Sequence, residues 1–299
     1  SHPTDAQGKP AAPGAQGKPK QHDKVTRMGT ESIPRLITEF AIPSILGMLV
    51  NGAYNVIDSI FLGQAMGEIG LSTATVAMPI ITVFMAIAML VGNGGNALAA
   101  LRMGEGKPEE AERSLGNTVT LSLIASVVVA IAMFIPPCIN ALLGVSGATP
   151  EDWDYAMQFI RIISLGFIFQ CIGMGVNNFI RTAGAPNRAL GTMIIGAVAC
   201  TVFNALFVLG MGMGVVGSAL ATVCGQAISC ATVLWYFCLT KGVPMRLHLH
   251  MMPLHGETVR LILSLGLASF AVQAGMAAVN FVLNNLVNMY GAQSPIGAE

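Results

Sequence analysis

Charge is scarce in this chain. Asp, Glu, Lys and Arg together make up 10% of its 299 residues, whereas hydrophobic residues make up 54%. Soluble domains carry about 25% charged residues, so this composition excludes an ordinary water-soluble fold. The 15 basic and 15 acidic residues cancel to a net charge of zero, and we expect no nucleic-acid partner.

The sequence also lacks the motifs of common cofactors. GMGVVG, residues 212–217, has the spacing of a dinucleotide-binding loop, but it lies between two apolar segments with no βαβ unit around it. The glycine-rich VGNGGNALAA, residues 91–100, has no Lys-Ser or Lys-Thr pair of a phosphate loop, and close helix packing explains its glycines better. We therefore expect no cofactor and no enzymatic activity.

Cysteine and histidine form no metal-binding pattern either. The six cysteines have no C-x-x-C spacing and lie in or beside apolar segments, which favours packing. HLHMMPLH, with His248, His250 and His255, matches no standard ligand spacing. We expect it to be a solvated linker at the membrane surface rather than a metal site.

Long apolar runs dominate the chain instead. A helix of about 20 apolar residues crosses the hydrocarbon core of a membrane, and these runs are continuous rather than alternating, which argues against a β-barrel. We predict an all-α integral membrane protein. Its seven membrane helices are expected near residues 37–62, 71–98, 117–139, 156–180, 189–209, 213–239 and 258–289.

The basic residues are distributed unevenly. They occur before the first apolar run and in the second, fourth and sixth connections, for example at Arg102, Lys107 and Arg181, whereas the odd-numbered connections hold none. Since Lys and Arg are retained on the cytoplasmic side, we expect a cytoplasmic N-terminus. Arg161 departs from this pattern, and we interpret it as an interfacial charge that snorkels or pairs with Asp154 rather than as a substrate residue.

Composition divides the chain into four parts. Residues 1–35, rich in Gly, Pro, Ala, Gln and Lys and without a signal-peptide core, are expected to form a disordered cytoplasmic tail. Residues 36–239 are expected to form a lobe of six membrane helices, residues 240–256 a cytoplasmic linker, and residues 257–299 the start of a second lobe.

Two internal repeats support this division. GKPEEA and GAPNRA, which begin at Gly106 and Gly184, share a Gly-x-Pro-x-x-Ala pattern that suits a turn between helices. A shift of 225 residues places Ser44 over Ser269, so the seventh helix is expected to restart the pattern of the first. The chain stops about where an eighth helix would begin, as expected for a fragment or for a vestigial second half.

One carboxylate, Asp58, lies well inside an apolar run, where a charged side chain costs roughly 2.5–3.5 kcal/mol. Asn51, Asn55 and Asp58 are spaced by four and three residues and therefore share a helix face. Three further pairs share a face: Cys200 with Asn204, Thr222 with Gln226, and Gln170 with Asn177. We expect these faces to converge around Asp58, although hydrogen bonds between helices would also explain each amide alone.

Four segments of the sequence resemble the motifs of a known family. FAIPSILGMLVNGAYNVIDSIFLG, NALAALRMGEGKPEEAERSLG, NNFIRTAGAPNRAL and GMGVVGSALATV resemble, in this order, the motifs of multidrug and toxic compound extrusion (MATE) transporters, in the bacterial multidrug-export branch. The resemblance runs from residue 34 to the end of the chain. It implies two lobes of six helices that export organic cations in exchange for protons or sodium ions. This chain would hold the first lobe and the first helix of the second.

The resemblance also assigns roles to residues. Asp58 matches the first-helix acid and is the expected ion-coupling residue, and Pro43 matches a first-helix proline that is the expected hinge. The expected lining of the substrate and ion cavity is Asn51, Asn55, Asn177, Asn204 and Thr222. Where members of the family often carry a fifth-helix Asn and then Asp, this chain has Cys200 and Asn204. Loss of that second acid favours the proton over sodium as the coupling ion.

We therefore expect multidrug efflux by cation-coupled antiport across a bacterial cell membrane. Small cationic or amphipathic drugs would be the substrates, and the lipid bilayer and a missing C-terminal lobe the partners. One alternative is an exporter or flippase of lipid-linked or polysaccharide substrates in the same superfamily, which would need several basic cavity residues where only Arg161 and Arg260 come near. Another is a non-transporting membrane scaffold, which would need no buried acid.

Overall fold

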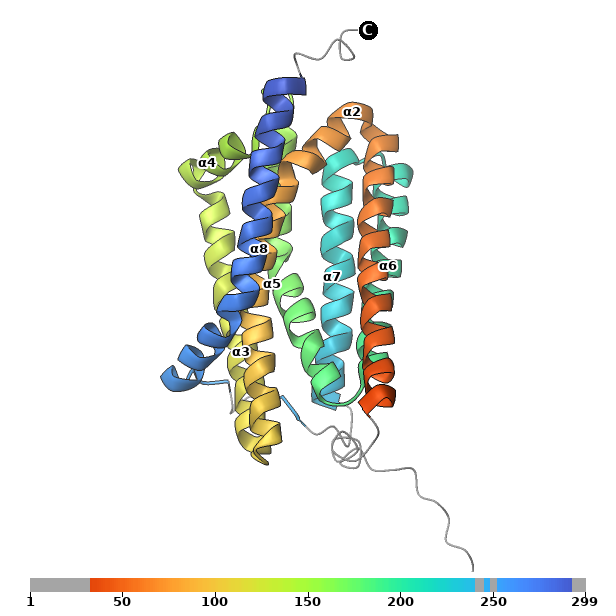
Figure 1. Ribbon diagram of the computed structural model, residues 1–299. Helices are drawn as coiled ribbons and strands as arrows, with labels where there is room; N and C mark the ends of the chain where they lie inside the picture. Colours follow the sequence, from red (N-terminus) through yellow and green to blue (C-terminus); the bar gives the residue numbers. More distant parts are fainter. Residues whose placement is uncertain (1–32, 240–244, 248–251, 292–299) are drawn as a thin grey trace, which may run out of the picture.

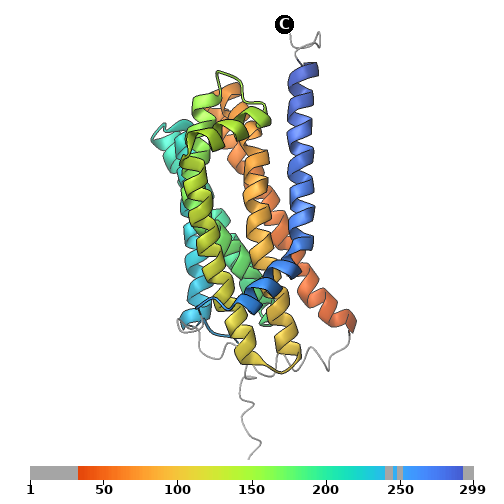
Figure 2. The ribbon, with the colours of Figure 1, turned by 90° about the vertical axis from the view of Figure 1, so that its left-hand side faces the viewer.

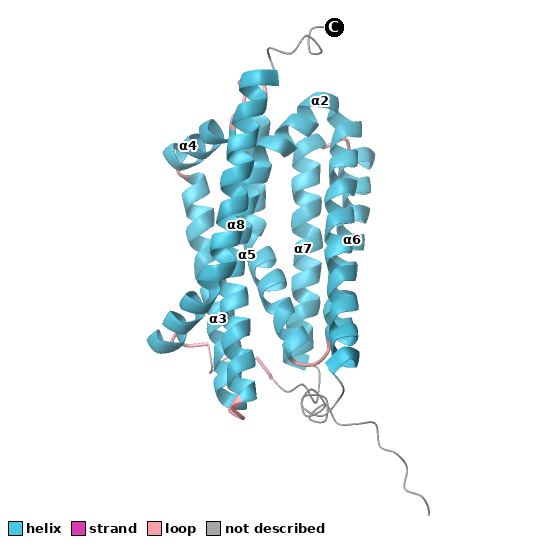
Figure 3. Ribbon diagram, in the orientation of Figure 1, coloured by secondary structure: helices cyan, strands magenta, loops and turns pink. Residues whose placement is uncertain are grey.

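The computed structural model describes residues 33–239, 245–247 and 252–291, and within these ranges the chain is helical with no strand (Figures 1 and 3). Its elements are α2 (Ile33–Gly104), α3 (Pro108–Phe134), α4 (Pro136–Ser146), α5 (Trp153–Thr182), α6 (Pro186–Asn204), the π-helix η1 (Ala205–Gly210), α7 (Gly214–Leu239) and α8 (Gly256–Gly291). Seven helical stretches of the described chain are long and apolar enough to cross a membrane. The predicted all-α membrane fold is confirmed, while the tail before residue 33 lies outside the described residues.

The first two membrane segments, Ile37–Gln64 and Met66–Gly104, both belong to α2. The prediction of a loop between them is wrong, because the chain changes direction at a kink at Gly67 instead. Gly67 has φ 60° and ψ −134°, a combination that is open essentially to glycine alone. In Figure 1 the first half of α2 rises beside α6 and α7, and the second half returns beside α5 and α8.

The third membrane helix also differs from its predicted range of 117–139. α3 begins earlier, at Pro108, because its first turns are charged and lie outside the apolar run. It ends at Phe134, and Ile135 is extended, with φ −80° and ψ 114°. Two prolines follow, and a residue before proline is disfavoured in helical conformation. The chain then forms the separate short helix α4, which the apolar pattern did not predict.

The two Gly-x-Pro-x-x-Ala segments form equivalent turns. Gly106 and Gly184 are left-handed, with φ 74° and 77°. After each glycine, the next backbone N–H donates to a carbonyl five residues back, Lys107 to Arg102 and Ala185 to Ile180. These are Schellman caps, and each is followed at once by a helix that has proline in its first turn. The predicted turn chemistry is confirmed.

Three glycines in the second half of α2 let three helices approach it closely. A Cβ added to Gly92 would overlap Gly175 of α5, and a Cβ added to Gly94 would overlap the Ile262 carbonyl of α8. A Cβ added to Gly95 would overlap Thr118 of α3. On the other side of the α8 crossing, a Cβ on Gly266 would overlap the Leu90 carbonyl. These glycines therefore serve helix packing, as predicted. Figure 2 shows α8 running along this part of α2 at one side of the bundle.

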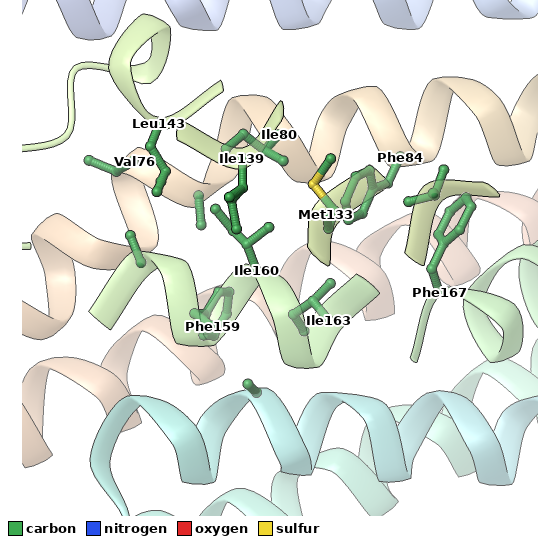
Figure 4. Packing of buried hydrophobic residues seen from close by; sticks show 14 of the residues in the cluster. Val76, Ile80, Phe84, Met133, Ile139, Leu143, Phe159, Ile160, Ile163 and Phe167 are labelled. Atoms are coloured by element: carbon green, nitrogen blue, oxygen red, sulfur yellow. The ribbon is translucent and has the colours of Figure 1, made fainter. Parts of the chain in front are cut away.

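Two apolar clusters hold the bundle together. The first joins α4 with the neighbouring halves of α2, α3 and α5 and the start of α7, and Figure 4 shows its side chains interdigitating around Ile139 and Ile160. Within it the Phe84 and Phe167 rings lie 5.3 Å apart between centroids. The second cluster joins α3, α5 and α7 in the other half and includes the fully buried Met245 of the connection to α8.

Residues 245–247 and 252–255 lie as a strap across α3. Three α3 side chains bind its backbone: Glu112 accepts from the Arg246 N–H at 2.9 Å, Thr120 donates to the Met252 carbonyl at 2.9 Å, and Asn117 accepts from the His255 N–H at 3.1 Å. The expected solvated linker is therefore docked in its described parts. His248 and His250 lie outside the described residues.

Candidate ion and substrate site

A cavity of about 1030 Å³ lies between both halves of α2 and helices α5, α6 and α7. Ligand pockets usually measure about 300–1,000 Å³, so this cavity has room for a drug-sized molecule. Six of its lining residues are methionines, namely Met48, Met78, Met85, Met89, Met174 and Met193. Methionine is flexible and polarizable and adapts to varied apolar shapes. The remaining lining includes Asp58, several amides and one arginine.

Asp58 is held at the cavity wall by two side chains from other helices. Its Oδ1 accepts hydrogen bonds from Asn204 Nδ2 of α6 and Ser218 Oγ of α7, both at 2.9 Å. Asp58 is half-buried and lines the cavity. Asn204 is fully buried behind it and is not among the lining residues, so its predicted place in the cavity lining is wrong. Ser218 is also fully buried. The other Asp58 oxygen, Oδ2, accepts no hydrogen bond from the described residues, so this atom is available to a proton or a cation.

A second group of polar side chains lies beside Asp58. Tyr54, one helical turn earlier on α2, donates to Thr222 Oγ1 of α7 at 3.5 Å. Cys200 lies one turn before Asn204 on α6, with its sulfur 3.5 Å from Asn204 Nδ2. The predicted faces of α6 and α7 therefore do meet Asp58. Ser218 was missed, although its position four residues before Thr222 places it on the same helix face.

Several amide oxygens here have no partner. Asn204 Oδ1, Gln226 Oε1 and Gln170 Oε1 are buried and accept no hydrogen bond from the described residues. Gln170 and Gln226 line the cavity. An unsatisfied buried acceptor costs about 1–3 kcal/mol, so these oxygens favour a bound group that donates hydrogen bonds.

Of the remaining predicted site residues, Asn177 and Asn51 line the cavity, whereas Pro43 does not. Asn177 lines the cavity, but its Nδ2 donates to Thr192 Oγ1 at 2.6 Å and to the Ala189 carbonyl at 3.1 Å, which ties α5 to α6. Asn51 lines the cavity one to two turns before Asp58, and the side chain of Asn55 lies outside the described part of the chain. Pro43 is buried near the start of α2 and is not among the residues that line the cavity.

A further polar layer lines the cavity between α2 and α5, and it was not predicted from the sequence. Asn178 Nδ2 donates to Asn93 Oδ1 at 2.8 Å, and Asn93 Nδ2 donates to Ser269 Oγ of α8 at 3.0 Å. Thr182 Oγ1 donates to Asn96 Oδ1 at 2.7 Å. Helical spacing gave a signal, since Asn178 and Thr182 are four residues apart. Without an acid nearby, nothing marked these amides as neighbours.

The two arginines of interest also differ from expectation. Arg181, assigned to a cytoplasmic connection, lies in the last turn of α5 and lines the cavity. Arg161 does not line the cavity, and its guanidinium lies 5.8 Å from the centroid of the Phe134 ring. None of the ion pairs of the described residues joins Arg161 to Asp154. Arg161 is therefore held by an aromatic contact with the last residue of α3 rather than by the expected carboxylate.

A bundle of membrane-length helices around a polar cavity with one embedded acid defines the class as a polytopic membrane protein. The sequence model of the family MatE matches residues 43–206, more than half of the chain. The chain therefore belongs to the MatE family.

Curated relatives are similar at low identity. A multidrug export protein MepA from Staphylococcus saprophyticus is 23% identical over 87% of this chain and 57% of its own length. A MepA from Staphylococcus haemolyticus is 22% identical over 87% of this chain and 57% of its own length. The chain thus spans somewhat over half the length of the curated relatives it matches.

Solved structures share the fold. The MATE multidrug transporter DinF-BH, solved as a complex with a ligand, matches with a TM-score of 0.82 and 35% identity, over 88% of this chain and 58% of that one. A MOP superfamily transporter from Pyrococcus furiosus, described as having a binding pocket of reverse polarity, matches with a TM-score of 0.75 and 25% identity, over 90% of this chain and 56% of that one.

Proposed function

We propose that this chain forms the ion- and drug-binding lobe of a multidrug exporter that exchanges an organic cation for a proton. The observation that carries the proposal is the Asp58 carboxylate, which is anchored through Oδ1 and open to the cavity through Oδ2. Relatives whose names state multidrug export or transport support the drug as cargo.

Asp58 can link the two cargoes because both compete for one negative charge. A carboxylate removed from bulk water is costly unless it is neutralised or paired. A proton on Oδ2 or a cationic drug beside it each removes that cost. Binding of a proton from outside therefore weakens the hold on the drug, and release of the proton inside restores it. Alternating access completes the exchange.

The proton is the proposed coupling ion, with sodium as the alternative. Among the described cavity-lining residues Asp58 is the single acid. Asn204, at the expected position of a second acid, donates a hydrogen bond to Asp58 instead of contributing charge. One carboxylate with donor neighbours suits a proton better than a metal ion, which needs several oxygen ligands.

Pro43 is the proposed hinge. It lies inside α2 about four turns before Asp58 and is buried. Proline removes one backbone hydrogen bond and allows a helix to bend. A change of charge at Asp58 is thus proposed to change the bend of the first half of α2.

An exporter of lipid-linked anions fits the cavity less well. Such a substrate calls for several basic side chains, whereas Arg181 is the single cation among the described lining residues. The methionine-rich wall supports an apolar, variable cargo instead.

Transport by the full-length protein in liposomes tests the proposal. We expect a fluorescent organic cation to move against its gradient when a pH gradient is imposed, and not when a sodium gradient of equal size is imposed at equal pH. Movement driven by the sodium gradient would identify sodium rather than the proton as the coupling ion. Movement under neither gradient, with the protein correctly folded, would overturn antiport.

A labelling experiment tests the proposed orientation. Glu68, exposed beside the Gly67 kink, and Lys107, exposed in the α2–α3 turn, lie at opposite ends of the second half of α2. With the N-terminus cytoplasmic, a cysteine replacing Glu68 should react with an impermeant thiol reagent on intact cells, and one replacing Lys107 should react only after lysis. The opposite pattern would invert the topology. Native cysteines are removed first, because Cys138 and Cys238 are exposed.

A further inference from the structure

A guanidinium lies at the inner end of the cavity. Arg181 belongs to the last turn of α5, is half-buried and lines the cavity together with Asn178 and Thr182. The proposed exchange of a cation for a proton gives this positive charge no role. A buried charge is retained at a cost unless it has a partner.

The described part of the chain gives Arg181 little to bind. Its Nη2 lies 3.5 Å from the thioether sulfur of Met193, which is a weak acceptor. No described carboxylate forms an ion pair with it, since the ion pairs of the described chain involve Arg102 and Lys107. A guanidinium has five N–H donors in a fork that fits carboxylate and phosphate oxygens. Most of these donors are left for a ligand.

The neighbouring side chains add a donor rather than negative charge. Asn96 accepts a hydrogen bond from Thr182 through its Oδ1, and it lines the cavity. Its Nδ2 group donates to no acceptor among the described residues. Gly47 of α2 lies against this guanidinium, because an added Cβ there would lie 3.4 Å from Nη2 and 3.1 Å from the Met193 sulfur. The inner end of the cavity is therefore positive and rich in donors.

We infer that Arg181 forms an anion subsite at the inner end of the cavity, which takes the carboxylate or phosphate group of an amphiphile. Asp58 lies eleven residues beyond Gly47 on the same helix, or roughly 16 Å at 1.5 Å per residue. The cavity is thus dipolar, negative at Asp58 and positive at Arg181. It suits zwitterionic amphiphiles as well as simple cations. This inference rests on the proposed function only in treating the cavity as the cargo site.

Binding of a matched dye pair tests the subsite. Rhodamine 19 carries a free carboxylate, and rhodamine 6G is its ethyl ester. For the purified full-length protein in uncharged detergent, fluorescence polarisation should show that Arg181→Gln weakens rhodamine 19 binding about tenfold, the value of one charge-assisted hydrogen bond. Rhodamine 6G binding should stay within about twofold, and Arg181→Lys should retain part of the preference. Arg188→Gln is the control, because Arg188 lies over Tyr236 and does not line the cavity.

A lipid competitor shows whether the anion that binds the subsite is a lipid headgroup or part of the cargo. If a lipid headgroup occupies the subsite, short-chain phosphatidylglycerol should displace rhodamine 19 from the wild type but not affect Arg181→Gln, whereas short-chain diacylglycerol, which has no anionic group, should displace it weakly. Without lipid competition, the anion belongs to the cargo. Equal losses for acid and ester in Arg181→Gln, or an unchanged ratio of their affinities, would overturn the subsite. Because these are equilibrium measurements, they stand even if gradient-driven transport fails.

Discussion

Replacement of Asp58 by asparagine should reduce gradient-driven efflux to the level of protein-free vesicles while the protein still folds. The amide is close in shape to the carboxylate, and its oxygen can still accept from Asn204 Nδ2 and Ser218 Oγ, which now bind Oδ1 at 2.9 Å. It also removes the charge penalty of the membrane interior. An amide does not take up a proton in the accessible pH range. The measurement is uptake of a fluorescent cation by inside-out vesicles under an imposed pH gradient.

Two further variants make this test specific. Glu39→Gln, at an exposed position near the start of α2, should leave efflux near the wild-type rate. The double variant Asp58→Asn with Asn204→Asp exchanges acid and amide across the 2.9 Å hydrogen bond and should restore part of the efflux. Near-normal transport by Asp58→Asn alone would mean that the acid is structural and that coupling occurs elsewhere.

A second large effect is expected where α8 crosses α2. Gly266→Val should lower the free energy of unfolding by about 3 kcal/mol, the upper part of the range for overpacked sites. The reason is that even the first added carbon overlaps the Leu90 backbone carbonyl, which cannot rotate away as a side chain can. Thermal unfolding in detergent, followed by size-exclusion chromatography, measures the loss.

The same helix supplies the control. Gly275 of α8 has no atom within 4 Å of an added Cβ, so Gly275→Val should cost far less than Gly266→Val. Gly275→Ala should raise stability slightly, because alanine favours the helix over glycine by roughly 0.5–1 kcal/mol. Similar losses at both positions would show that the close crossing is not what the glycine serves.

The apolar runs predicted the helices well, because the hydrocarbon thickness fixes their length and leaves a backbone no alternative to helix. The runs did not predict the joints. Gly67 reverses α2 without a loop, and nothing in hydropathy distinguishes it from a glycine that packs, such as Gly94. α3 extended beyond its predicted start because charged residues continue a helix outside the membrane as readily as apolar residues do inside it.

The candidate site was predicted in part. Asp58, Asn204 and Thr222 were expected together, and Asn204 does bind Asp58 while Thr222 lies one helical turn from Ser218. A charge in an apolar run is costly enough to stand out in one sequence. Asn93 and Asn178 are neutral and could lie against any helix, so only the crossing of α2, α5 and α8 brings them together. Arg181 was misplaced because charge alone does not distinguish a cavity end from a loop.

The strap across α3 fixes the start of α8, and the close crossing at Gly266 is the point about which the rest of the helix can tilt. Backbone groups of Arg246 and His255 are held to α3, and α8 then crosses α2 at Gly266 with almost no clearance. From that crossing to Gly291 the helix extends roughly 38 Å at 1.5 Å per residue. A tilt of about 10° about the crossing would therefore move the Gly291 end of α8 by roughly 6–7 Å, given this length. A hydrogen bond of 2.7 Å from Asn285 Nδ2 to the Val145 carbonyl joins this part of α8 to α4. Its breakage would therefore report such a tilt.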